Sequence, residues 1–249
     1  MSVNDMRYAL VMALNELKPR LYALLLTVLF SAMLGYICGK SVATAIEGRM
    51  AIADLYTTFY PDLVLLAMLP TLGALSVSKE YLSWSMLADE PFLKRLSFYR
   101  MWPIPVKVVA WSRMFHMLIC FAATMTAFLY MFVQVSWPAF SELINIWQYI
   151  VYLLMWVGYA LAINGIHPFF EFGAKGTTLA VVAMVIIVLM VGLVSLLHYA
   201  LGKPIYVSMI EAVQHSLVLP SVISILVGLI GVGVFQQSLT RRLLKRDFS

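Results

Sequence analysis

Six long apolar runs constrain this chain more than any other feature of its sequence. They cover residues 21–38, 56–77, 114–135, 148–166, 177–197 and 217–237. Each is close to the roughly 20 residues that a helix needs to cross the hydrocarbon core of a bilayer. Because lipid offers no partners to backbone N–H and C=O groups, such segments have to be helical. The runs therefore predict an all-α polytopic membrane protein with six transmembrane helices.

The composition leaves too little polar surface for a protein folded in water. Hydrophobic residues make up 63% of the 249 residues and charged residues only 12%, whereas soluble domains average about 45–50% and about 25%. This difference excludes soluble enzymes, disordered proteins and nucleic-acid binders. Six spans leave few residues for anything else, so we expect residues 1–249 to form a single transmembrane domain.

The lysines and arginines predict how the spans are oriented. Six spans place both termini on one side, and a cytoplasmic location of the termini puts fourteen of the seventeen basic residues inside. Only Lys40, Arg49 and Lys203 then fall in outer loops. Because cytoplasmic loops are enriched in lysine and arginine, we expect a multi-pass protein of the cell (plasma) membrane. Both termini are expected in the cytoplasm, and residues 238–249 form a basic cytoplasmic tail.

Residues 1–20 have the spacing of an amphipathic helix. The apolar side holds Met6, Ala9, Leu10, Ala13, Leu14 and Leu17, and the polar side holds Asp5, Arg7, Asn15, Glu16 and Lys18. This pattern predicts a cytoplasmic helix on the inner membrane surface; the alternative is a plain extension of the first span. The segment lacks the basic head and cleavage site of a secretory signal, so we expect it to be retained.

The longest segment between two spans, residues 78–113, lies on the cytoplasmic side of this topology. We expect a short helix over residues 80–88, ended by an Asp-Glu-Pro stretch, because the residue before a proline avoids the helical region. Pro103 and Pro105 then interrupt the chain, and residues 106–113 can run directly into the third span. The loop is too small to recognise a large solute, but another protein can dock on it.

This arrangement resembles that of the permease subunits of type-2 ABC exporters. In that family an amphipathic helix precedes six spans, and a coupling helix that starts with glutamate, between spans two and three, sits on the ATPase. Lys79-Glu80-Tyr81 resembles the start of the coupling helix, and residues 98–106 with Ala110–Arg113 resemble the proline-containing passage into the third span. Where the family commonly has Gly-Thr after the glutamate, this chain has Leu82-Ser83-Trp84-Ser85.

The resemblance implies that a separate ABC ATPase subunit binds ATP and Mg²⁺, while this chain binds no cofactor. It also implies a second permease, in a homodimer or heterodimer, surrounded by membrane lipid. The residues expected to couple to the ATPase are Glu80, Tyr81, Trp84, Arg100 and Trp102. The function implied is ATP-driven transport, with export of a hydrophobic or amphipathic substrate such as a peptide, drug or lipid.

No catalytic motif appears in the sequence. Gly39-Lys40-Ser41 looks like the end of a phosphate-binding loop, but Leu34 stands where that loop needs a glycine. The motifs of intramembrane enzymes are also missing, so an enzyme is the least favoured class. The main alternative to a transporter is a membrane sensor, immunity or scaffold subunit that only docks other proteins.

Polar side chains inside apolar runs are costly to insert and are therefore candidates for function. Asp62 follows Pro61 in the second run, with Pro70 further along, so a kink there would free carbonyls to line a cavity. His116 and Gln134 lie near opposite ends of the third run. We expect Asp62, His116 and Gln134 to be candidates for a translocation path. The alternatives are that Asp62 lies in the headgroup zone and that the other two are interface or interhelical hydrogen-bonding residues.

Two other groups of residues indicate no site. His167 and Glu171 have the spacing of one helix face, but two ligands without a third make a weak metal site, so no metal is expected. Cys38 ends the first run whereas Cys120 lies well inside the third. Their depths differ too much for a disulfide, and we expect two free thiols.

The last apolar run carries small residues at one-turn intervals. They are Ser221, Ser224, Gly228 and Gly231, and they would let another helix approach closely. The neighbouring helix belongs either to the same subunit or to a dimer partner. Before this run, residues 199–216 form an outer connection that, in the resembled family, often dips back into the membrane as short helices.

Overall fold

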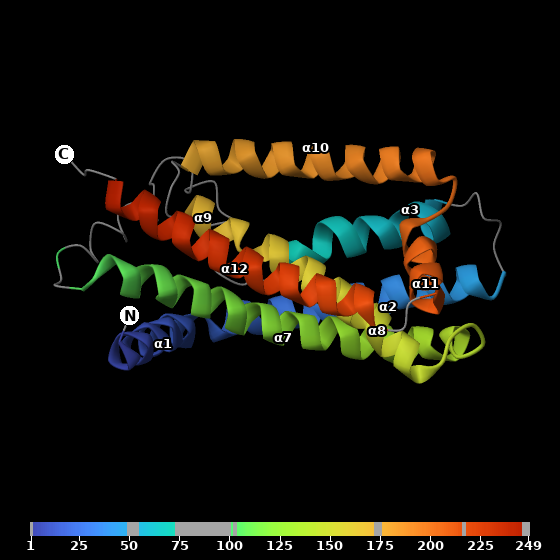
Figure 1. Cartoon of the computed structure of the whole chain (residues 1–249), viewed down its shortest axis with the longest axis horizontal. Coiled ribbons are helices and arrows are strands. Elements are labelled where there is room, and N and C mark those ends of the chain that lie inside the picture. Colours follow the sequence, from blue (N-terminus) through green and yellow to red (C-terminus); the bar gives the residue numbers. More distant parts are fainter. Residues whose placement is uncertain are drawn as a thin grey trace.

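Figure 1 shows the computed structural model of the chain, an elongated bundle of helices. The structure describes residues 2–48, 55–72, 101, 104–171, 176–215 and 218–245. Within these ranges all regular elements are helical, as the apolar runs predict. The elements are α1 (Val3–Leu17), η1 (Lys18–Arg20), α2 (Leu21–Ile46), α3 (Leu55–Leu63), η2 (Val64–Met68), η3 (Leu69–Thr71), α7 (Val106–Phe140), α8 (Ile146–Asn164), α9 (Ile166–Glu171), α10 (Gly176–Leu201), α11 (Ile205–His215) and α12 (Leu219–Lys245).

Five helical runs in the described ranges are long and apolar enough to cross a membrane. They are Val3–Ile46, Val106–Phe140, Ile146–Phe170, Met184–Leu201 and Leu219–Lys245. The predicted second span is helical over Leu55–Thr71, but residues 73–77 lie outside the described ranges, so a sixth crossing stays a prediction. The chain is therefore a helical membrane protein with at least these five candidate spans.

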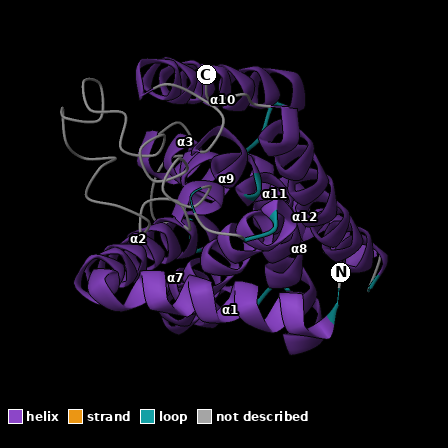
Figure 2. Ribbon diagram, turned by 90° about the vertical axis from the view of Figure 1, so that its left-hand side faces the viewer, coloured by secondary structure: helices purple, strands orange, loops and turns teal. Residues whose placement is uncertain are grey.

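The helices form two tightly packed pairs that make up the body of the bundle. α2 lies along α7, and α8 lies along α12. α1 and the C-terminal end of α12 lie at one end of the bundle, and α11 lies at the other (Figure 1). We call these the α1 end and the α11 end. Viewed along the bundle, α1 runs across its end rather than parallel to the other helices (Figure 2).

A capping box starts α1. The Ser2 hydroxyl accepts a hydrogen bond from the backbone N–H of Asp5 at 3.2 Å, and the Asp5 carboxylate accepts one from the N–H of Ser2 at 2.9 Å. These bonds, chiefly that from the Ser2 backbone, hold the pKa of Asp5 below its usual value. An ionised Asp5 also suits the positive end of the helix dipole, so the predicted N-terminal helix is stabilised from its first turn.

The side of α1 that packs on α7 differs from the predicted apolar side by one important residue. Ala9, Ala13 and Leu17 are buried as expected. Glu16, expected on the polar side, is also buried. The exposed members of the predicted apolar side are Leu10 and Leu14. The prediction was wrong for Glu16 because α7 carries a buried arginine that compensates its charge.

Glycine brings α2 and α7 into close contact. A Cβ atom at Gly35 would lie 2.3 Å from the carbonyl oxygen of Phe128, so only glycine fits there. The Ser31 hydroxyl, one turn earlier, donates to the Thr124 carbonyl at 2.7 Å. α2 continues to Ile46, past the predicted end at residue 38. The tripeptide that resembles a phosphate-binding loop is therefore part of a helix.

The small residues of α12 face α8 of the same chain. A Cβ atom at Gly228 would lie 2.8 Å from the Gly158 carbonyl oxygen, and one at Gly158 would lie 2.4 Å from the backbone of Ser224. The Ser224 hydroxyl donates to the Met155 carbonyl at 2.6 Å. The predicted close approach is confirmed, and it occurs within the subunit rather than at a dimer seam.

The second apolar run is an irregular helix, which is in keeping with its prolines. Pro61 lies inside α3, which passes into the π-helical segment η2 and then into η3, with Pro70 near its start. Because proline has no N–H, it interrupts the ladder of helical hydrogen bonds. The Tyr159 hydroxyl donates to the Leu66 carbonyl at 2.8 Å. The Leu66 carbonyl is therefore hydrogen-bonded to a side chain of α8.

α10 lies at the edge of the bundle and buries little of its surface (Figure 1). Its contacts are mainly with α3, η2 and α11. Val194 is its fully buried apolar residue among those described, whereas Met184 and Tyr199 are 72% and 92% exposed. Most of the α10 surface is apolar and suited to lipid.

Cys38 and Cys120 are buried free thiols, as predicted.

The glycine contacts predict a large difference between two Gly→Ala variants. Gly158→Ala places a methyl group against the backbone of Ser224 and should lower stability by about 1–3 kcal/mol through overpacking. Gly192→Ala on α10 has nothing within 4 Å of the new atom and should be neutral or slightly stabilising. Thermal unfolding of both purified variants in detergent measures the difference; equal midpoints would contradict the close α8–α12 contact.

Candidate functional site

The predicted site residues lie in three different surroundings. The coupling residues Glu80, Tyr81, Trp84, Arg100 and Trp102 lie outside the described ranges, so their roles stay predictions. Of the residues predicted for a translocation path, Asp62 and His116 are buried and Gln134 is exposed on α7. Asp62 contacts α10 and α11, whereas His116 lies beneath α1. Among the described residues, Asp62 and His116 therefore belong to two separate polar centres.

A buried ion pair ties α1 to α7. Arg113 Nη1 lies 2.9 Å from Glu16 Oε2, and their side chains are only 2% and 7% exposed. His116, less than one turn further along α7, is 1% exposed and lies close to both charges. Removing either charge would take a close counterion from a buried group, which is costly. The pair therefore fixes where α1 crosses the start of α7.

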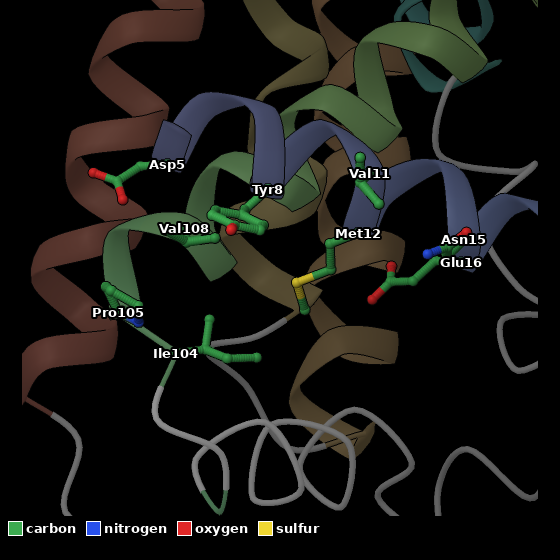
Figure 3. Close-up of a pocket in the computed structure, with 9 residues that line it drawn as sticks. All are labelled: Asp5, Tyr8, Val11, Met12, Asn15, Glu16, Ile104, Pro105 and Val108. Atoms are coloured by element: carbon green, nitrogen blue, oxygen red, sulfur yellow. The ribbon is translucent and has the colours of Figure 1, made fainter. Parts of the chain in front are cut away.

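A groove runs beside this ion pair. It has a volume of about 650 Å³ and lies between α1 and the first turn of α7 (Figure 3). Its lining is mainly apolar, with Asp5 and Glu16 as the charged members, and consists of Asp5, Tyr8, Val11, Met12, Asn15, Glu16, Ile104, Pro105 and Val108. Since Glu16 is paired with Arg113, the groove is not strongly acidic and does not indicate a metal or nucleotide.

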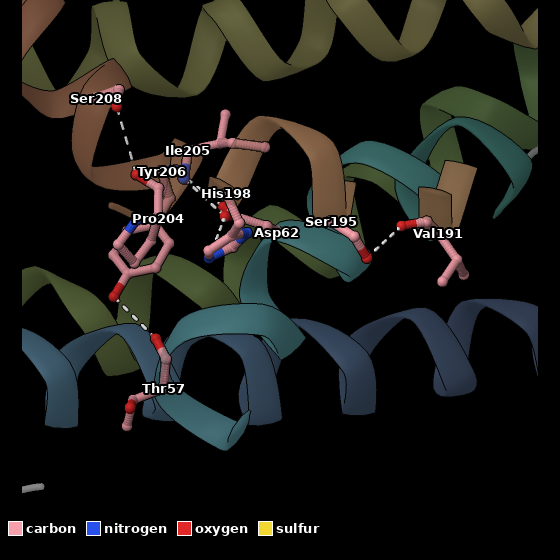
Figure 4. A network of polar contacts seen from close by, with 9 residues as sticks. All are labelled: Thr57, Asp62, Val191, Ser195, His198, Pro204, Ile205, Tyr206 and Ser208. Carbon is pink, nitrogen blue, oxygen red and sulfur yellow. Dashed lines mark hydrogen bonds and ion pairs between the residues drawn. The ribbon is translucent and has the colours of Figure 1, made fainter. Parts of the chain in front are cut away.

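The second polar centre is built around Asp62 near the α11 end. Asp62 Oδ2 accepts a hydrogen bond from the N–H of Ile205 at 2.7 Å, and Oδ1 accepts one from the N–H of Tyr206 at 2.9 Å. The carboxylate thus caps the first turn of α11 from 143 residues away in the sequence. A further bond joins the same two helices: the Tyr206 hydroxyl of α11 donates to the Thr57 carbonyl of α3 at 2.9 Å (Figure 4).

The chemistry of α11 explains why it needs this distant acceptor. The residue before its first turn is Pro204, which has no side-chain oxygen to accept from the free N–H groups of a helix start. Asp62 supplies the missing acceptor and, being negative, also suits the positive end of the helix. Asp62 is 0% exposed, so its carboxylate is enclosed by the chain itself; whether it lies at the depth of the headgroups stays open.

Sequence reasoning missed the partners of both centres. Arg113 was predicted only as a basic residue of the passage into the third span, and Glu16 only as a residue of the polar side of the first helix. A usable signal was that Glu16 and Arg113 have opposite charges and each lies beside small or apolar residues of its own helix, so the two helices could pair there. For Asp62, the signal was the proline at the N-cap of α11, which predicts that the cap comes from elsewhere in the chain. Choosing Asp62 as that cap needed the tertiary structure.

Replacement of the Glu16–Arg113 pair gives a direct test of its role. Arg113→Met alone leaves a buried carboxylate and should cost about 3–5 kcal/mol. Arg113→Met combined with Glu16→Leu removes both charges and should recover much of that loss. Arg7→Gln on the exposed side of α1 is the matched control and should be neutral. Thermal unfolding measures all three; a double variant no better than the single one would contradict a buried pair.

Asp62→Asn should loosen α11 specifically. The amide can accept one of the two N–H bonds at most and no longer carries charge, so we expect a loss of about 2–3 kcal/mol. Hydrogen exchange of the amides of Ile205 and Tyr206 should accelerate accordingly. Ser208→Ala, which removes a long 3.5 Å contact on the same helix, is the control. Unchanged exchange in the Asp62 variant would contradict the capping role.

Comparison with known proteins identifies no relative of this chain. No protein-family model matches it. Neither the curated protein sequences nor the solved structures contain a significant match.

Proposed function

We propose that this chain is the permease subunit of an ATP-driven ABC transporter. It exports a hydrophobic or amphipathic substrate, such as a peptide, drug or lipid, and is driven by a separate ATPase subunit that binds ATP and Mg²⁺. Two permease chains, identical or related, enclose the path. The proposal rests on the resemblance of the loop over residues 78–113, on the distribution of basic residues, and on the way the described residues connect that loop to the bundle.

The observation that carries the proposal is the continuity of α7. This helix begins at Val106, directly after Pro105, and runs without a break to Phe140. A displacement at the end of the preceding loop would therefore be passed along the whole length of the bundle. Val109 and Ala110, in the first turns of α7, pack against Leu239 and Leu243 of α12, so α12 would feel the same displacement.

The ion pair between Glu16 and Arg113 attaches α1 to the start of α7, so that α1 would move with it. Arg113 lies two turns into α7 and holds Glu16 of the helix that crosses the α1 end. If the α1 end faces the cytoplasm, as the basic residues predict, then α1 lies at the membrane surface next to the start of α7. An ATPase that pushes on the coupling loop would then move α1 and α7 together, which couples ATP binding to a change of the bundle.

The test uses two glutamates of the same loop. A candidate ABC ATPase, sought first among the products of adjacent reading frames, is co-expressed with this chain, and its co-purification and ATP hydrolysis are measured. Glu80→Ala should weaken docking and abolish the stimulation of hydrolysis by this chain, because Glu80 starts the proposed coupling helix. Glu90→Ala, beside Pro91 outside that helix, is the matched control and should leave both unchanged.

Two outcomes would contradict the proposal. If Glu80→Ala leaves docking and stimulated hydrolysis intact, the coupling helix is placed wrongly. If no ATPase binds the chain or responds to it, the sensor, immunity or scaffold alternative is favoured over the transporter.

A further inference from the structure

Large aromatic side chains are exposed toward the α11 end of the bundle. Tyr199, in the last turn of α10, is 92% exposed, and Trp147, in the first turn of α8, is 72% exposed. Tyr130, in the second half of α7, is 63% exposed. None of these three side chains has a hydrogen-bond partner among the described residues. Each therefore offers an apolar ring and a free polar group to whatever surrounds the protein.

The exposed residues change in character along α10. Val188 and Leu196 are 69% and 64% exposed, and apolar side chains of this kind suit the hydrocarbon core. Tyr199 follows within one turn, and the partly exposed Lys203 lies in the link after the helix. Tyrosine and tryptophan are enriched where hydrocarbon meets headgroups, because the ring stays in lipid while the polar group reaches water. The end of α10 therefore has the pattern of a membrane interface.

α7 shows the same order of exposed residues. Tyr130 and Gln134 are both exposed and four residues apart, so they lie on one face of the helix. One turn earlier on that face, the Thr126 hydroxyl is satisfied by the Ala122 carbonyl of its own helix at 2.7 Å. A glutamine amide facing hydrocarbon would lack partners, which is costly, whereas a headgroup layer supplies them. An interface at this level accounts for the outward position of Gln134.

The arrangement of α11 brings the end of α10 and the start of α8 to one level. α11 runs across the bundle rather than along it (Figure 1), and it begins at Ile205, shortly after α10 ends at Leu201. Near the other end of α11, the Gln214 side chain donates to the carbonyl of Leu143, in the link between α7 and α8, at 3.3 Å. Because a helix that crosses the bundle has both ends at a similar position along the bundle axis, these two links lie at a similar depth.

We propose that Tyr130, Trp147 and Tyr199 form an aromatic belt that anchors the α11 end in the phospholipid headgroup layer. The ester and phosphate oxygens of the lipids accept hydrogen bonds from the two phenol hydroxyls and the indole N–H. Asp62, which caps the first turn of α11, then lies at the depth of this layer and is shielded from it by the protein. The inference does not depend on an ATPase partner.

The test measures membrane depth in the purified full-length chain in phosphatidylcholine nanodiscs. A nitroxide is attached to Tyr199→Cys or to Val188→Cys. Its collision rates with oxygen, which concentrates in hydrocarbon, and with a water-soluble nickel chelate give its depth. Both positions are exposed on the same helix, so the two labels differ in depth and not in burial. The native Cys38 and Cys120 are buried, and the parent protein gives their background.

The two labels on α10 should report clearly different depths. Eleven residues of helix separate them by about 16 Å, which is close to half of the roughly 30 Å hydrocarbon thickness. The label at position 199 should therefore lie at the headgroup layer and the label at position 188 near the bilayer centre. On α8, Trp147→Cys should match Tyr199→Cys in depth, and Leu154→Cys should lie about 10 Å deeper.

Three results would overturn the proposal. The first is a label at position 199 that lies as deep as the label at position 188. The second is a label at position 199 that collides with the nickel chelate as freely as a label in bulk water. The third is a label at position 199 that is immobile and shielded from both oxygen and the chelate, which would assign this face to a second copy of the chain. Because the labelled positions lie on the outer surface, the substitutions leave the packed interior unchanged.

Discussion

The arrangement of the helices depends on a set of buried polar groups that find partners on neighbouring helices. On the outer surface of a soluble protein water can partner polar groups, but the surface of a lipid-embedded helix has no such partner. The solutions recur throughout the described residues. Serine hydroxyls on α2 and α12 donate to carbonyls of the neighbouring helix, a tyrosine satisfies a carbonyl of η2, and a carboxylate caps a helix that cannot cap itself. Each bond also fixes how two helices sit together.

The two charged centres provide such partners at opposite ends of the bundle. Glu16 and Arg113 join the crossing helix α1 to α7, and Asp62 joins α3, α10 and α11. Between them, aromatic side chains such as Phe140, Tyr149 and Tyr152 stack between α7 and α8. The body is therefore tightly packed while its polar attachments lie near its ends. In the proposed transporter, the ATPase would displace the helices at the α1 end, and the bonds of Asp62 would hold them together at the α11 end.

Much of the fold was predictable because the membrane permits few structures. Three features could be predicted from patterns along a single helix: the helical runs, the direct entry of α7 from Val106 and the small-residue face of α12. The side of α1 that is buried was harder, since Glu16 looks polar by any scale. Its burial depends on Arg113, almost one hundred residues away, and no local periodicity reports such a partner.

The sequence by itself determined that this chain is a helical membrane protein and where its apolar runs lie, because hydrogen bonding in lipid leaves the backbone no alternative. It also singled out Asp62 as a costly residue. Only the tertiary structure decided what Asp62 contacts, since a carboxylate can cap a distant helix only when particular N–H groups are brought to it. Pairing between helices is a matter of three-dimensional contact, and the order of residues along the chain does not specify it.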